Sequence, residues 1–243
     1  MLALLVLLTG LLPATSAADP GETEDRSDPR AVRIARSVME KMGGQASWDS
    51  TRYLRWTFFG RRRHTWDRFT GNIRIEDGDQ VTLMNIRTLK GKVFKGGEEV
   101  TDPAELKTLL EQGHQIWVND SYWMFMPYKL LDPGVTLGYA GTRAMADGRP
   151  ADVLILSFDK GIGYTPENHY DVFVAKDTGL VEQWSFYKDG SQEKPGFTLP
   201  WAAWRRFGKI MLAMHHGRDM DWAISVPEDL PAAVLTNPEA AGN

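Results

Sequence analysis

Apolar and polar residues alternate with a period of two over much of this chain, and turn signals interrupt the alternation at short intervals. Such a pattern is typical of antiparallel strands that bury one face. From Tyr53 onward it predicts strands at 53–59, 65–69, 72–76, 80–87 and 92–95. The clearest hairpin turns at Asp77-Gly78, because an Asp-Gly turn matches the twist of two paired strands. This hairpin is expected to pair Ile73 and Ile75 with Val81 and Leu83.

Helical spacing of apolar residues replaces the alternation in two places. Asp28 is suited to cap a helix that has Pro29 at its first position and ends at Gly43-Gly44. The apolar residues of this helix are Val32, Ala35, Val38, Met39 and Met42. A second helical segment begins at Asp102-Pro103, and Gly113 is expected to interrupt it or end its first part. Its apolar side consists of Leu106, Leu109, Leu110, Ile116 and Trp117.

The alternation resumes after an irregular segment that follows Met126-Pro127. It predicts strands at 135–139, 153–158, 169–175 and 180–187, and the last two form a hairpin around Asp177-Thr178-Gly179. Further strands are expected at 198–209, 210–216 and 222–226. No internal repeat is present. The order of elements predicts an α+β fold in which helices cover one face of a large curved antiparallel sheet.

The first residues of the chain indicate export. Residues 1–18 have the apolar run and the small-residue cleavage site of a signal peptide, and the run is too short to span a bilayer. We therefore expect a periplasmic protein with no stable membrane span after cleavage. Residues 19–27 are polar and predict a flexible spacer, 28–226 form the single folded domain, and 227–243 predict a loosely packed tail.

Composition and motifs argue against several classes of function. The net charge of -4 and the pI of about 5.8 disfavour nucleic acid as a partner. The chain has no cysteine, so it has neither disulfides nor a thiol nucleophile. The histidines do not show metal-ligand spacing, and no nucleotide-binding or serine-hydrolase motif occurs. We therefore expect no metal, no cofactor and no enzymatic activity.

Nine tryptophans and ten methionines stand out in a chain of 243 residues. Two interpretations remain open: these side chains fill the core, or part of the set lines an apolar groove that accommodates an acyl chain. The candidates for such a cavity are Trp56, Phe58, Trp66, Trp117, Tyr122, Trp123, Met126, Trp184, Phe186, Trp201 and Trp204. The polar candidates in the loop beside them are Asn119, Asp120, Lys129 and Asp132.

Four stretches of the sequence resemble a known group of proteins. They are WVNDSYWMFMPYKLLDPGVTL at 117–137, the MGG that ends the first helix, GIGYTPENH at 161–169, and the late TGLVEQWSFY. They are similar to exported bacterial proteins of unknown function that are grouped with the LolA and LolB-like lipoprotein-sorting proteins of the outer membrane. The resemblance spans roughly 28–225 and implies an incomplete antiparallel β-barrel whose concave apolar side is closed by helices.

The resemblance also implies a function, because the lipoprotein carriers hold acyl chains in that cavity. We therefore expect a soluble periplasmic binding or carrier protein for an acyl chain, lipid or lipoprotein, with an envelope protein as a further partner. One alternative is an envelope enzyme whose acid or base is among Asp120, Asp132, Glu167 and His169. Another is a non-catalytic scaffold with a filled core.

Overall fold

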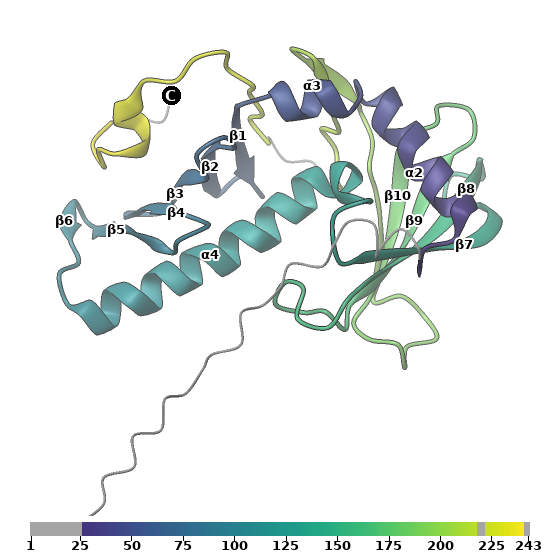
Figure 1. Cartoon of the computed structure of the whole chain (residues 1–243), viewed down its shortest axis with the longest axis horizontal. Coiled ribbons are helices and arrows are strands. Elements are labelled where there is room, and N and C mark those ends of the chain that lie inside the picture. Colours follow the sequence, from purple (N-terminus) through teal and green to yellow (C-terminus); the bar gives the residue numbers. More distant parts are fainter. Residues whose placement is uncertain (1–25, 218–221, 241–243) are drawn as a thin grey trace, which may run out of the picture.

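The computed structural model describes residues 26–217 and 222–240. The predicted signal peptide at 1–18 and most of the predicted spacer lie outside the described residues. The fold is α+β with antiparallel strands, as predicted, but the strands do not form one continuous sheet. They divide into sheets of six and five strands plus a pair, because the long helix of the insertion separates the two runs of strands (Figure 1).

The first sheet is a meander in which every strand pairs with its neighbour in sequence. Its strands are β1 (Tyr53–Phe58), β2 (Arg62–Asp67), β3 (Asn72–Asp77), β4 (Gln80–Asn85), β5 (Lys90–Lys95) and β6 (Glu98–Glu99). Short connections leave no room for any other order, so local turn chemistry alone determines this half of the topology.

The predicted register of the β3–β4 hairpin is wrong by one residue. Ile73 lies opposite Met84 and Ile75 lies opposite Thr82, because Asp77 pairs with Gln80 and the turn falls on Gly78 and Asp79. Gly78 has a positive φ of 64°, which the tight turn requires at this position. Ile73 and Ile75 still face the core, since a one-residue change of partner leaves the side of β3 that they occupy unchanged.

Helix α4 (Pro103–Phe125) is continuous, so Gly113 neither interrupts nor ends it. A side chain at 113 would lie 3.1 Å from Thr82 Cγ2 and 3.4 Å from Met84 Sδ, and glycine therefore allows the helix to lie close against β4. Asp102 caps the first turn by accepting a hydrogen bond from the amide of Glu105. A short 3-10 turn, η1 (Met126–Lys129), follows the helix directly.

The second sheet has the order β11-β10-β9-β8-β7. Its strands are β7 (Val135–Ala144), β8 (Pro150–Phe158), β9 (His169–Ala175), β10 (Val181–Tyr187) and β11 (Phe197–Pro200). The predicted strands at 198–209 and 210–216 are confirmed in part: β11 and the pair β12 (Arg205–Phe207) and β13 (Ile210–Leu212) form there, but 201–204 and 213–216 do not belong to these strands. At 222–226 a single bridge joins Ser225 to Arg55.

Helix α2 (Pro29–Lys41) begins as predicted, with Asp28 accepting hydrogen bonds from the amides of Arg30 and Ala31. It ends before Gly43 and Gly44, whose φ values of 120° and 84° suit glycine. The short helix α3 (Gln45–Ser50), which the sequence pattern did not indicate, follows at once. The Asp28 amide also donates to the carbonyl of Leu137 at 2.7 Å, and this bond fixes α2 against β7.

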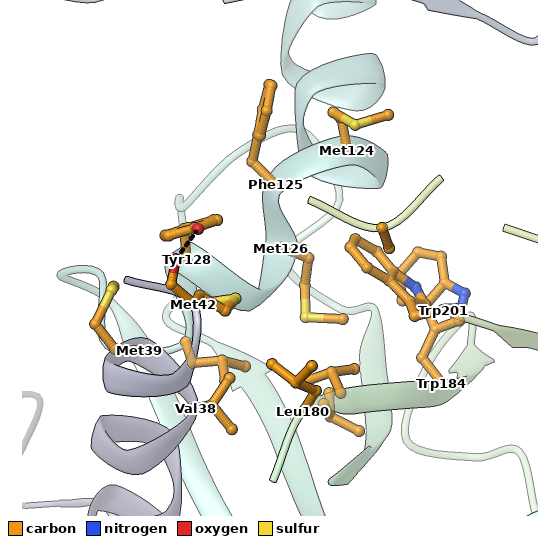
Figure 2. Packing of buried hydrophobic residues seen from close by; sticks show 14 of the residues in the cluster. Val38, Met39, Met42, Met124, Phe125, Met126, Tyr128, Leu180, Trp184 and Trp201 are labelled. Atoms are coloured by element: carbon orange, nitrogen blue, oxygen red, sulfur yellow. Dashed lines mark hydrogen bonds between the residues drawn. The ribbon is translucent and has the colours of Figure 1, made fainter. Parts of the chain in front are cut away.

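The main core lies where α2, the end of α4 and the second sheet meet (Figure 2). Val38, Met42, Met126 and Trp201 are essentially inaccessible there. Tyr128 Oη donates to the carbonyls of Met42 and Met211 at 3.0 and 2.8 Å, so it links η1 to both neighbouring segments. A smaller core packs the first half of α4 on the first sheet through Leu109 and Leu110. Helix α4 therefore contacts both sheets.

The prediction of a loose tail after 226 is wrong for its described part, 227–240. Leu230 and Val234 pack against Tyr53 of β1. The buried guanidinium of Arg74 on β3 donates to the carbonyls of Val234, Asn237 and Pro238 at 3.4, 2.9 and 2.9 Å. A buried cation supplies donors that the composition of the tail does not reveal, and these donors hold the segment on the first sheet.

Candidate functional site

A cavity of about 1000 Å³ is the candidate site. The second half of α4, the inner face of β9 and β10, and the segment 158–168 form most of its wall, and Trp48, the end of β2, residues of 129–135 and Phe197 contribute the rest. Its volume lies at the upper end of the range for pockets that bind small molecules. The cavity is large enough to hold a ligand with many heavy atoms.

Regular spacing on two elements brings the lining side chains to the cavity. On α4, residues 114, 118 and 122 and residues 117, 121 and 125 recur every four positions, so they share one face of the helix. On β10, Trp184 and Phe186 are two residues apart and point to the same side of the sheet. Tyr170 lies opposite Phe186 on β9 and joins this side. The local periodicities of one helix and two strands therefore build the wall.

Aromatic rings cover the sheet side of the cavity. The ring of Tyr170 stacks on Trp184 with centroids 4.9 Å apart, and Trp123 of α4 meets Trp184 edge-on at the same separation. Phe186 stacks on Phe197 of β11, also at 4.9 Å. These pairs interlock the side chains of three strands and the helix. The result is a rigid apolar wall.

Arg68, just after β2, provides a positive charge at another part of the lining. Its guanidinium lies over the ring of Trp48, with Cζ 3.8 Å from the centroid, and 5.5 Å from the ring of Trp66. Nη1 donates to the carbonyls of Trp48 and Thr51, the latter at 2.7 Å. Burial lowers the pKa of Arg68 to about 10, so the side chain remains charged at neutral pH.

The other charged side chains of the lining are Lys129 and Asp132, which form an ion pair with each other. Together with Arg68 they leave the lining with one net positive charge, two cations against one carboxylate. The whole chain has a net charge of -4. The cavity is therefore locally positive in an acidic protein.

Several donors in the lining are buried and have no hydrogen-bond partner among the described residues. They are Arg68 Nε, Trp66 Nε1, Trp117 Nε1, Tyr122 Oη and Trp184 Nε1. Buried polar groups are ordinarily hydrogen-bonded, because losing water without a replacement costs free energy. An arginine Nε and an indole nitrogen can only donate, so this set of groups lacks acceptors.

The segment 159–168 closes one side of the cavity. Tyr164 Oη and His114 Nδ1 of α4 are hydrogen-bonded at 2.6 Å. Ile162 packs on Gly134, where a Cβ would lie only 2.5 Å from Ile162 Cγ1, so only glycine leaves room for it. The amide of Asp159 donates to the carbonyl of Gly134 at 2.9 Å. The segment is thus fastened at its first residue and at Ile162 and Tyr164.

The structure brings most of the sequence candidates together. The lining contains Trp66, Trp117, Tyr122, Trp123, Trp184 and Phe186, together with the polar candidates Asn119, Lys129 and Asp132. It does not contain Trp56, Phe58, Met126, Trp201, Trp204 or Asp120. The two sets were indistinguishable by residue type, so their separation reflects the packing of the elements.

The remaining apolar candidates lie in the core or pack against it. Trp56 stacks on His64 at 4.5 Å, and Phe58 meets Trp222 edge-on at 5.8 Å. Met126 and Trp201 are fully buried. Trp204 Nε1 donates to the carbonyl of Val181 at 3.0 Å, which orients its ring along β10.

Asp120 was expected in a loop, but it lies on α4, fully buried and away from the cavity. Its carboxylate accepts from Arg62 Nε and Nη2 at 2.7 and 2.8 Å, and His64 Nε2 lies 2.8 Å from it. Burial alone would raise the pKa of Asp120, yet the hydrogen bonds from His64 and Arg62 lower it below its usual value. Asp120 therefore joins α4 to β2 as a charged anchor.

Several lining residues were not among the sequence candidates. They include Trp48, Arg68, His114, Phe158, Tyr164, Tyr170 and Phe197. The alternation within β9 and β10 could have indicated Tyr170, since it is opposite Phe186 across the pair. Nothing local distinguishes Arg68 from the other arginines at 61–63.

The enzyme alternative was expected to bring two of its four candidate groups into one pocket. Only Asp132 of these four lines the cavity. The ring of His169 stacks on Tyr187 at 4.5 Å, outside the lining. Within 26–217 and 222–240, no group of three metal-ligating side chains occurs. None of the helices in these ranges is long and apolar enough to cross a membrane.

No family model and no curated protein matches this sequence. Among solved structures, the chain is similar to a DUF1329 family protein from Desulfovibrio piger, with 11% identity, a TM-score of 0.45, and coverage of 87% of this chain and 98% of that one. The chain is also similar to a domain assigned to outer membrane lipoprotein sorting from Vibrio parahaemolyticus, with 7% identity, a TM-score of 0.41, and coverage of 85% of this chain and 96% of that one. A third similar structure is a LolA superfamily protein from Nitrosomonas europaea, with 12% identity, a TM-score of 0.37, and coverage of 83% of this chain and 97% of that one. Two of these structures carry descriptions from the lipoprotein-sorting group that the four stretches of sequence resemble.

Proposed function

We propose that this protein is an exported, periplasmic binding or carrier protein that holds an acyl chain, as part of a lipid or lipoprotein, in the cavity beside α4. The observation that supports the proposal is the aromatic lining of a cavity of about 1000 Å³. A scaffold with a filled core would have no use for such a volume. Each CH₂ group that leaves water contributes about 0.8 kcal/mol, so a partly buried chain of ten carbons binds without a specific polar contact.

The experiment that tests the proposal measures uptake of cis-parinaric acid, a fluorescent fatty acid, by the mature protein. Phe186→Glu places a carboxylate in the lining, where it repels a fatty acid and cannot be solvated by an apolar chain. Ile155→Glu is the matched control, because Ile155 lies on the same sheet, is 39% exposed and does not line the cavity. Thermal unfolding verifies that both variants are folded.

We expect the parent and Ile155→Glu to bind the fatty acid with similar affinity and Phe186→Glu to lose at least about tenfold. Native mass spectrometry of protein purified from its own periplasm then identifies the co-purified acyl species. Equal uptake by all three folded proteins, or no uptake by the parent, would contradict the proposal.

A further inference from the structure

We propose that the part of the cavity around Arg68 is a subsite for the anionic headgroup, a carboxylate or phosphate, of a single-chain amphiphile. This inference rests on the proposed function, since the acyl chain occupies the aromatic part of the same cavity. It adds the chemical class of the ligand, which the apolar lining does not specify.

The charge of Arg68 has no carboxylate in contact among the described residues. Two other arginines in or next to the first sheet pair closely, Arg62 with Asp120 and Arg52 with Asp67, at 2.7 and 2.9 Å. Within 26–217 and 222–240 no such ion pair involves Arg68, and the carboxylates that act on it, Asp49 and Asp132, do so without an ion-pair contact. Asp132 is itself paired with Lys129. A half-buried cation in this situation attracts an external anion.

The guanidinium is also held in a fixed orientation. Two backbone carbonyls engage Nη1, and Cζ lies over the ring of Trp48, 3.8 Å from its centroid. Nε is buried and without a partner. Because these contacts restrict the side chain before any ligand arrives, little rotamer entropy is lost when an oxygen acceptor binds the remaining donors.

Neighbouring donors point to the same chemistry. The rings of Trp66 and Trp117 are 5.2 Å apart, and Arg68 Cζ lies 5.5 Å from the first of them. Both indole nitrogens are buried without an acceptor. Indole and guanidinium groups donate only, so a ligand that satisfies them has to supply several acceptor oxygens. Carboxylates and phosphates do so and also carry negative charge, whereas a single hydroxyl has one oxygen and an ammonium group has no acceptor.

The test compares ligands that share a twelve-carbon chain and differ in the headgroup: dodecanoate, dodecyl phosphate, the neutral monododecanoylglycerol and dodecyltrimethylammonium. Isothermal titration calorimetry measures each dissociation constant for the mature protein below the micelle concentration. We expect the parent to bind one anionic ligand at least about tenfold more tightly than the neutral one, because hydrogen bonds to an ionised acceptor are stronger than those to a neutral one. A preference for dodecanoate assigns a carboxylate headgroup, and a preference for dodecyl phosphate assigns a phosphate.

Two variants connect this preference to Arg68. Arg68→Met removes the charge and keeps the apolar stem, and it is expected to reduce the ratio of anionic to neutral affinity to about threefold or less. Arg68→Lys retains the positive charge but lacks the planar guanidinium with its paired donors, and it is expected to give an intermediate ratio. Arg61→Met is the control, because Arg61 is exposed, paired with Asp77 and not part of the lining, so the parental ratio should persist.

The outcomes separate the two proposals. Equal binding of anionic and neutral ligands by the parent would overturn the headgroup subsite and leave the acyl cavity intact. The same holds for a ratio that Arg68→Met leaves unchanged. If Arg68→Met does not fold, the ratio of anionic to neutral affinity is compared between the parent and Arg68→Lys instead. If none of the four ligands binds the parent, the proposed function fails as well.

Discussion

His114 on α4 and Tyr164 in the segment 159–168 are joined by a hydrogen bond of 2.6 Å across one side of the cavity. Their rings also meet edge-on, with centroids 5.8 Å apart. Tyr164 is about half exposed, so this contact lies at the boundary between the cavity and solvent. It fastens a glycine-rich segment of the second sheet to the helix that packs on the first.

Tyr164→Phe removes this hydrogen bond and keeps the ring contact. We expect amide hydrogen exchange within 159–168 to accelerate about fivefold, because one hydrogen bond contributes about 1 kcal/mol to the closed segment. Tyr187→Phe is the control, since its hydroxyl donates to Asp171 at 3.3 Å and lies outside the lining. Unchanged exchange at 159–168 in Tyr164→Phe would show that packing of Ile162 alone holds the segment.

Asp120→Asn should destabilise the protein by about 3 kcal/mol, because it leaves the charge of Arg62 without its carboxylate and weakens the hydrogen bond with His64. Asp77→Asn breaks the exposed pair with Arg61 and should cost less than about 1 kcal/mol. Urea unfolding at pH 7 measures both changes. Similar costs for the two variants would mean that Asp120 does not act as a buried anchor.

His216 should make stability depend on pH. Burial lowers its pKa to about 4, whereas an unfolded histidine titrates near about 6.5. As pH falls below about 6.5, the unfolded state takes up the proton first, so stability is lost until about pH 4 and then levels off. From pH 7.5 to pH 5 the loss from this group should be about 2 kcal/mol.

The variant His216→Phe tests this dependence. Phenylalanine retains an aromatic ring between Trp201 and Trp222 but cannot titrate. The difference in unfolding free energy between pH 7.5 and pH 5 should therefore shrink by about 2 kcal/mol relative to the parent. An unchanged difference, or an NMR titration of His216 near pH 6.5 in the folded protein, would disprove the assignment.

The described tail should contribute to stability through Arg74. Arg74→Met removes three hydrogen bonds to tail carbonyls and is expected to cost about 2–3 kcal/mol. Arg87→Met is the matched control. Arg87 also donates to two backbone carbonyls, those of Arg68 and Phe69, but its side chain is exposed. It should cost less than about 1 kcal/mol. Equal costs, measured by urea unfolding, would mean that the tail adds little.

Local patterns predicted the elements of this fold better than their assembly. The cap at Asp28, the end of α2 at Gly43-Gly44, and the β9–β10 hairpin depend on residues close together in sequence, and all three are found. The division into two sheets depends on which distant strands pair, and no local pattern encodes that. Gly113 shows the same limit, since its tolerance in α4 is due to contact with β4.

The candidate site shows this contrast most clearly at Trp56 and Trp66. Both lie in alternating strands of one hairpin, where they pair with His64 and Leu54. Yet Trp56 is 1% exposed and packed in the core, whereas Trp66 lines the cavity. The path of α4 across the sheet decides which ring is covered. Residue type therefore identified aromatic side chains as candidates, but it did not identify which of them line the cavity.

The tryptophans of the lining give the protein a built-in optical reporter. Trp48, Trp66, Trp117, Trp123 and Trp184 all contact the cavity, and indole emission depends on the polarity around the ring. Trp201 and Trp222 are packed in the core away from it and provide a constant background. An unlabelled molecule that enters the cavity would thus shift the wavelength and change the intensity of the protein's own tryptophan emission, so occupancy can be followed in unmodified protein.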